Sequence, residues 1–158
     1  MEVSAQPLFS VLSPLTLSPK RRVLIVDDEE SVTNILQRSL ARLSPDLEVW
    51  RANSGAQALE LLNRERFDLL ITDYFMPNVS GLELTQTVRH RRPDIKIIWM
   101  TAYPSPEFTD LLDGLAVDCF LIKPFSIRVL REIVCRLLVS SAPRGDGHER
   151  RENRDSDC

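Results

Sequence analysis

Short hydrophobic runs alternate with amphipathic stretches along the middle of the chain. The runs have the length and continuity of strands that are buried on both faces, as in a parallel sheet. They predict strands at residues 23–26, 47–51, 67–72, 95–100 and 119–122. The stretches that follow them predict helices at residues 31–43, 54–64, 80–91, 106–112 and 126–139. This alternation predicts a doubly wound α/β fold, in which five helices cover both faces of one five-stranded parallel sheet.

Individual residues mark the ends of the predicted helices. Ser54 and Ser126 occupy N-cap positions, where a side-chain oxygen accepts a hydrogen bond from a free backbone N–H group. Pro93 closes the third helix and Gly114 ends the fourth. The helical period of the first helix predicts one inward face, made of Val32, Ile35, Leu36, Ser39, Leu40 and Leu43.

The two ends of the chain have a different composition from the middle. Proline and serine dominate the first residues, and Glu2 stands where a signal peptide would carry basic residues. We expect a disordered leader at residues 1–20, one domain at 21–140 and a disordered charged tail at 141–158. No second globular segment follows the domain, so we expect no DNA-binding domain in this sequence. A piece of a longer protein is the alternative that this tail leaves open.

Composition and charge narrow the class of protein. Of the 158 residues, 43% are hydrophobic and 27% charged, which is typical of a globular domain. The net charge of -3 is too small to indicate a nucleic-acid partner or an anionic membrane surface. No apolar run approaches the roughly 18 residues of a membrane span. Cys119, Cys135 and Cys158 have no paired spacing, which favours a reducing, cytoplasmic setting.

Acidic residues stand where two of the predicted strands end. Asp27 and Asp28 follow the first strand, and Asp73 ends the third. Sites in such sheets lie outside the carboxyl ends of the strands, near the point where strand order reverses. Three carboxylates there would raise at least one pKa unless they share a cation. Mg²⁺ fits, because it binds one or two carboxylates and leaves room for phosphate oxygens. The alternative to a metal site is that acidic residues before a helix interact favourably with the helix dipole. This explanation suits Glu29 and Glu30 better than the three aspartates.

Thr101 and Lys123 follow two further strands and complete this pattern. A phosphoryl group beside one Mg²⁺ still has oxygens that accept hydrogen bonds from an ammonium or a hydroxyl group. Pro124 restricts the backbone of Lys123 and therefore the direction of its side chain. The alternative is that Lys123 only forms an ion pair with Asp73 in an inactive site.

Four segments, residues 23–28, 69–77, 100–102 and 120–125, together resemble the receiver domain of two-component response regulators. The resemblance covers residues 21–140 and implies the flavodoxin-like, receiver-type form of the fold. It implies a regulatory domain whose only chemistry is its own phosphorylation and dephosphorylation, so the chain is not expected to be an enzyme in any other sense.

The resemblance also implies a role for each acidic residue. Asp73 would be the phosphoacceptor. Asp28 and Asp73 would bind Mg²⁺ together with the backbone carbonyl of Phe75, and Asp27 would act mainly through metal-bound water.

The remaining roles concern the phosphoryl group and the partners. Thr101 and Lys123 would contact the phosphoryl group, and Phe120 would be the switch aromatic that turns inward as Thr101 moves. The donor would be a phosphohistidine on a sensor histidine kinase or a histidine phosphotransfer protein. The changed surface, formed by the fourth helix, fifth strand and fifth helix, would bind a downstream protein or a second copy of the chain.

Other functions find less support in the sequence. A docking module that keeps the fold without phosphorylation is the main alternative. A haloacid-dehalogenase-like phosphatase needs a second acid where Phe75 stands, and no GxxxxGK[ST] loop is present. The basic residues 89–92 lie at the carboxyl end of the predicted third helix, where positive charges interact favourably with the helix dipole. Contact with nucleic acid is the alternative interpretation. Phe75 and Tyr103 stand at positions where members of the family often have small or polar residues. We hypothesise that these two side chains slow hydrolysis of the acyl phosphate. The other interpretation is that they are ordinary surface aromatics.

Overall fold

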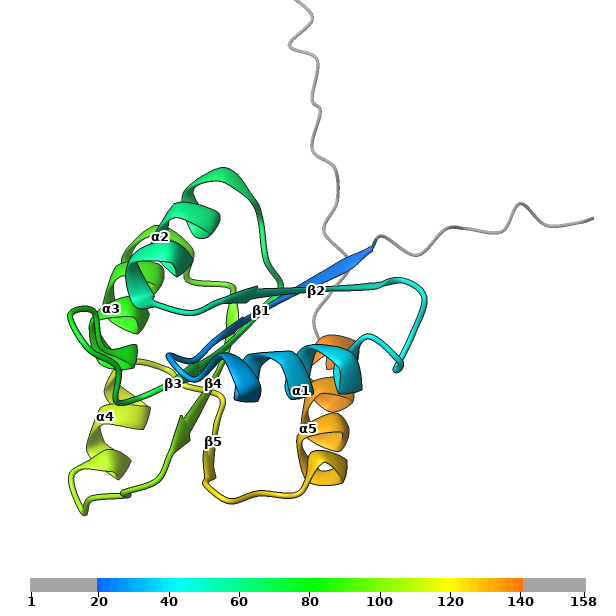
Figure 1. Ribbon diagram of the computed structural model, residues 1–158. Helices are drawn as coiled ribbons and strands as arrows, with labels where there is room; N and C mark the ends of the chain where they lie inside the picture. Colours follow the sequence, from blue (N-terminus) through cyan, green and yellow to red (C-terminus); the bar gives the residue numbers. More distant parts are fainter. Residues whose placement is uncertain (1–19, 141–158) are drawn as a thin grey trace, which may run out of the picture.

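The protein folds as one parallel sheet between two layers of helices (Figure 1). The computed structural model describes residues 20–140, so the expected leader and tail lie outside the described residues, apart from Lys20. The strands are β1 (Arg21–Val26), β2 (Leu47–Ala52), β3 (Leu69–Asp73), β4 (Lys96–Thr101) and β5 (Cys119–Ile122). The helices are α1 (Glu30–Leu40), α2 (Gly55–Arg64), α3 (Gly81–Arg91), α4 (Phe108–Gly114) and α5 (Ile127–Ser140).

The order of the strands confirms the doubly wound fold. The sheet runs β2-β1-β3-β4-β5, and every neighbouring pair is parallel. From β1 the chain passes first to one side and then to the other, so strand order reverses between β1 and β3. At this reversal the carboxyl ends of two central strands lie side by side, where ligands bind in open α/β sheets.

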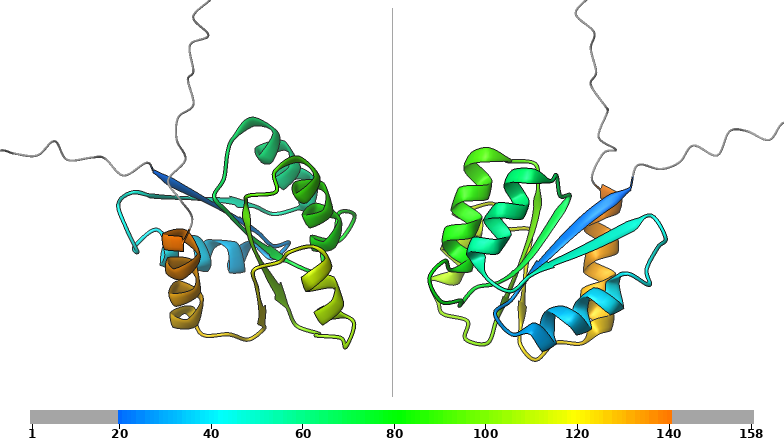
Figure 2. Two further views of the ribbon diagram at one scale, coloured as in Figure 1. Left: turned by 180° about the vertical axis from the view of Figure 1, so that it is seen from behind. Right: turned by 45° about the horizontal axis from the view of Figure 1, so that its top comes forward.

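The central strands are buried because both faces of the sheet are covered. In β1, Leu24 and Val26 pack with α2, α3 and α4, whereas Val23 and Ile25 pack with α1 and α5. Figures 1 and 2 show these two layers, with α1 and α5 on one face and the other three helices opposite. This explains why the strands are continuous apolar runs. Among residues 20–140, no helix combines the length and apolarity required to cross a bilayer.

The predicted caps are present. The Ser54 side chain accepts a hydrogen bond from the Gln57 N–H at 3.1 Å, and the Ser126 side chain accepts one from the Arg128 N–H at 3.2 Å. Five boundaries differ from the prediction by more than one residue: β1 begins at residue 21, α1 ends at residue 40, β3 begins at residue 69, and α4 begins at residue 108 and ends at Gly114. These are shifts of two or three residues at element ends, where local sequence signals are weakest.

The predicted orientation of Ile35 is wrong. Its side chain is 57% exposed, and the buried residues of α1 are Thr33, Leu36 and Leu40. Successive helical residues are about 100° apart, so a stripe centred on these three places Ile35 on the outer face. Thr33 is tolerated inside because its hydroxyl donates to the Glu30 carbonyl at 3.0 Å.

Candidate functional site

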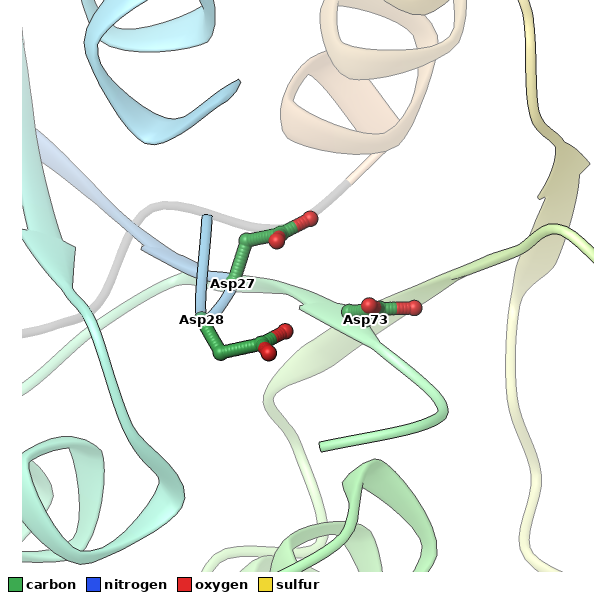
Figure 3. A group of neighbouring side chains, drawn as sticks. All are labelled: Asp27, Asp28 and Asp73. Carbon is green, nitrogen blue, oxygen red and sulfur yellow. The ribbon is translucent and has the colours of Figure 1, made fainter. Parts of the chain in front are cut away.

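Three carboxylates lie together at the point where strand order reverses. Asp27 and Asp28 directly follow β1, and Asp73 is the last residue of β3. Each offers a carboxylate oxygen, and these oxygens lie within 4.8 Å of one another (Figure 3). Asp27 and Asp73 are buried, whereas Asp28 is exposed. The structure therefore brings together the three acids that the sequence placed at strand ends.

Lys123 joins this acidic group from the end of β5. Its Nζ donates to Asp27 Oδ2 at 2.7 Å and lies 3.4 Å from Asp73 Oδ2. The other Asp27 oxygen accepts a hydrogen bond from the Glu29 N–H at 2.9 Å. Both oxygens of Asp27 are thus already engaged. The sequence-based alternative paired Lys123 with Asp73 alone, so the shorter contact with Asp27 was not anticipated.

Asp28 and Asp73 are more available to a ligand than Asp27 is. The Asp28 carboxylate accepts no hydrogen bond from any residue of the described part of the chain. The three acids offer only carboxylate oxygens as possible metal ligands, and such oxygens suit a small, hard cation. This acidic pocket is therefore compatible with Mg²⁺.

Burial and charge shift the pKa of two site residues. Burial raises the pKa of Asp73, the charge of Lys123 opposes that rise, and the charge of Asp27 adds to it. A raised pKa was expected from repulsion among the acids, but burial contributes more. Burial alone would lower the pKa of Lys123, yet its hydrogen bond to Asp27 and the charges of Asp27 and Asp73 outweigh this, so its pKa is raised.

The backbone around Asp73 is held by α3 and β4. The N–H of Tyr74 donates to the Met100 carbonyl at 2.8 Å, and the Tyr74 carbonyl accepts from the Gly81 N–H at 2.9 Å. A Cβ atom at Gly81 would lie 2.2 Å from the Asp73 carbonyl oxygen. Only glycine permits this approach. Gly81 was not among the predicted site residues, although a glycine next to the N-cap Ser80 is a recognisable signal in the sequence.

Thr101 ends β4 and is fully buried. Its Oγ1 accepts a hydrogen bond from the Tyr103 N–H at 3.1 Å, so its own hydroxyl hydrogen remains able to donate. Three aromatic side chains near the strand ends reach solvent: Phe120 is 38% exposed, Phe75 54% and Tyr103 76%. The roles of these residues remain predictions.

The sequence matches known proteins over the region that forms the sheet. The profile of the response regulator receiver domain matches residues 23–135. Response regulator protein PilR of Pseudomonas aeruginosa is 38% identical over 120 residues, which are 75% of this chain and 26% of PilR. Response regulator MprA of Mycobacterium leprae is 36% identical over 124 residues, which are 77% of this chain and 53% of MprA. The chain thus spans between a quarter and about half of these relatives.

Solved structures agree with the profile. The chemotaxis protein CheY4 of Vibrio cholerae superposes with a TM-score of 0.69 at 29% identity, covering 74% of this chain and 98% of CheY4. The response regulator TrrA of Thermotoga maritima, solved in complex with Mg²⁺ and BeF, gives a TM-score of 0.64 at 36% identity, covering 74% of this chain and 98% of TrrA. This chain belongs to the response regulator receiver domain family.

Proposed function

We propose that this chain is a phosphorylation-switched receiver of a two-component system or phosphorelay, which accepts a phosphoryl group on Asp73 with the help of Mg²⁺. The observation that carries the proposal is the Asp28 carboxylate, which remains exposed beside Asp27 and Asp73. The Lys123 ammonium lies between those two carboxylates. This arrangement supports the presence of a nucleophile, a cation site and a hydrogen-bond donor for phosphoryl oxygens within one small space.

Four residues would hold the metal. Asp28, Asp73 and the backbone carbonyl of Phe75 would bind Mg²⁺ directly, and Asp27 would act mainly through metal-bound water. When bound, Mg²⁺ would neutralise charge on the phosphoryl oxygens. The Mg²⁺ and BeF in the TrrA structure support this assignment, because TrrA is 36% identical to this chain. The engagement of both Asp27 oxygens supports an indirect role for that residue.

The transfer itself is a displacement at phosphorus. An Asp73 carboxylate oxygen attacks the phosphorus of a phosphohistidine, the P–N bond breaks, and the donor imidazole leaves with the electron pair of that bond. The product on Asp73 is an acyl phosphate. Lys123 donates to one phosphoryl oxygen, and the Thr101 hydroxyl hydrogen donates to another. The same site would later hydrolyse the acyl phosphate, which is the full extent of its own catalysis.

Partners follow from this chemistry. The donor is a sensor histidine kinase or a histidine phosphotransfer protein in a reducing, cytoplasmic compartment. After phosphorylation, Thr101 moves toward the phosphoryl group and Phe120 turns inward, which changes the face formed by α4, β5 and α5. That face binds a downstream protein target, or a second copy of the chain as a homodimer. Its exposed Ile122 offers an apolar contact for such a partner.

The second candidate is a docking module that works without phosphorylation. The close contact between Lys123 and Asp27 favours neither function by itself, because an inactive site would also retain an ion pair. The exposed, unengaged Asp28 favours the receiver, since a purely structural site has no use for it.

Transfer from a panel of autophosphorylated histidine kinases separates the two candidates. Labelled phosphate should move to the wild type from at least one kinase and not to Asp73→Ala, while the exposed-site control Asp113→Ala accepts it normally. Failure with every kinase, combined with partner binding that is the same for wild type and Asp73→Ala, would favour the docking module.

A further inference from the structure

The residue after Asp73 contacts α4 through a set of aromatic rings. The Tyr74 ring centroid lies 4.5 Å from that of Phe108, the first residue of α4. The Phe108 ring lies 6.3 Å from that of Phe120 on β5. We call Tyr74, Phe108 and Phe120 the aromatic path. It leads from the Asp73 backbone to the β5 face through side chains alone, and it does not include Thr101.

Trp99 gives this path a fixed base. Its ring is fully buried, with its centroid 5.0 Å from that of Tyr74 and 5.8 Å from that of Phe108. Its Nε1 donates to the Thr85 hydroxyl at 2.8 Å, which fixes the indole to α3. Because its hydrogen bond holds Trp99 in place, we expect a movement of Tyr74 to displace Phe108 and not Trp99.

The first turn of α4 depends on Phe108. Phe108 is the one buried residue in this seven-residue helix, and the neighbouring Thr109 and Asp110 are exposed. The residue before it, Glu107, makes no side-chain capping hydrogen bond. A short helix without a cap has little stability of its own, so its position is set by the packing of its buried side chain.

The other end of α4 is held by Arg89. The guanidinium donates to the carbonyls of Leu115 at 2.8 Å and Ala116 at 2.6 Å, and it lies 3.5 Å from a carboxylate oxygen of Asp118. These contacts join the end of α3 to the residues that follow α4. The helix is therefore tied at its carboxyl end by polar contacts, in its middle by the partly buried Leu111 and Leu112, and at its amino end by the Phe108 ring.

We propose that α4 pivots about the end held by Arg89, and that Phe108 couples its free end to both Tyr74 and Phe120. For its trigger, the inference rests on the proposed phosphorylation of Asp73. A change at Asp73 then reaches the β5 face by two routes, through Thr101 and through the aromatic path. Since a contact chain alone does not establish coupling, the path needs a measurement of energetic coupling between its ends.

A double-mutant cycle on the unphosphorylated protein provides that measurement. The unfolding equilibrium constant is compared for wild type, Tyr74→Leu, Phe120→Leu and the double variant. The double variant should depart from the product of the single effects by at least about threefold, as coupled sites do. In a Phe108→Leu background the departure should vanish. If Phe108→Leu does not unfold cooperatively, Phe108→Met replaces it, because the flexible Met side chain fills irregular gaps. The control pair is Tyr74→Leu with the α5 variant Val129→Ala. Their separate effects on the unfolding equilibrium constant should multiply, which indicates no coupling.

Amide hydrogen exchange tests the link to phosphorylation. Per phosphorylated molecule, the change in exchange of residues 108–114 should fall by at least half in Tyr74→Leu relative to wild type. Independent effects of Tyr74 and Phe120, a coupling that survives without an aromatic ring at position 108, or an undiminished exchange response would each overturn the inference. An absence of adduct in the wild type would instead contradict the proposed function, and the cycle would still decide whether the path exists.

Discussion

Lys123 Nζ lies 2.7 Å from Asp27 Oδ2, so an ammonium at the end of β5 neutralises a carboxylate that follows β1. The Asp27 side chain has no exposed surface, and that of Lys123 is 20% exposed. A buried ion pair adds little net stability compared with apolar residues, but removing one partner leaves an uncompensated buried charge. The two residues are therefore important to the metal-free fold, in addition to their proposed roles in phosphorylation.

The first prediction concerns this ion pair. Lys123→Ala should lower the free energy of unfolding by about 3 kcal/mol, because Asp27 keeps its charge and loses its partner. Chemical denaturation by urea measures the change. The control is Lys20→Ala, which removes an exposed pair with Glu48 and should cost less than about 0.5 kcal/mol. Equal losses in the two variants would show that the buried pair has no special importance.

The second prediction follows from the raised pKa of Asp73. In the metal-free protein, a carboxyl with a raised folded-state pKa contributes most to stability below its unfolded pKa, and this contribution is lost as pH rises through the folded pKa. Asp73→Asn should therefore stabilise the protein near neutral pH, and the gain should shrink as the pH is lowered toward about pH 3. Unfolding across pH measures this, with the exposed Asp110→Asn as control. A gain that grew on acidification would have the wrong sign.

The third prediction concerns the metal. Mg²⁺ at about 100 times its Kd should stabilise the wild type by about 2.7 kcal/mol, because it binds the folded state alone. A thermal melt would show the rise in Tm, and a chelator should reverse it. Asp28→Asn should abolish most of the shift, since Asp28 is the exposed, unengaged carboxylate. An Asp28→Asn variant that responds to Mg²⁺ as the wild type does would exclude Asp28 as a ligand.

The fourth prediction compares two glycines. Gly81→Ala should destabilise the fold by about 3 kcal/mol and slow phosphorylation, because its Cβ would lie 2.2 Å from the Asp73 carbonyl oxygen and displace Asp73. Gly114→Ala is the matched control. Its Cβ would meet nothing within 4 Å, and alanine is favoured over glycine in a helix by about 0.5–1 kcal/mol. Opposite signs are expected in denaturant titrations, and a harmless Gly81→Ala would refute the close approach.

The fifth prediction concerns the lifetime of the phosphorylated form. Phe75 and Tyr103 are exposed close to the ends of β3 and β4. We hypothesise that these bulky rings hinder an attacking water molecule. The double variant Phe75→Asn, Tyr103→Glu should shorten the acyl-phosphate half-life severalfold, measured by loss of the adduct mass after removal of donor. A half-life of seconds in the wild type that the double variant leaves unchanged would reduce both residues to ordinary surface aromatics.

The sequence predicted the fold because its signals are local. Continuous apolar runs such as Leu69–Thr72 identify buried strands without knowledge of their neighbours, and the position of Asp27 and Asp73 at strand ends follows directly. The features that were missed depend on how elements pack. Lys123 lies closer to Asp27 than to Asp73, and α3 approaches Asp73 at Gly81; both distances depend on the packing of elements that are far apart in the sequence.

The orientation of α1 illustrates the same limit. Ile35 and Leu36 are both apolar and adjacent, so the helical period alone does not decide which one faces the sheet. The structure buries Leu36 and exposes Ile35, because Thr33 occupies the remaining inward position. The aromatic path is likewise invisible in the sequence, since Tyr74, Phe108 and Phe120 meet only after three separate elements pack together.

Intact-mass analysis after incubation with acetyl phosphate tests the central claim most directly. Wild type and Asp73→Ala are compared with and without Mg²⁺, and Asp113→Ala serves as the control for loss of an exposed acid. The proposed function predicts a single phosphoryl adduct on the wild type and on Asp113→Ala that requires Mg²⁺ and is absent from Asp73→Ala. An adduct that persists in Asp73→Ala, or that forms equally without Mg²⁺, would contradict it.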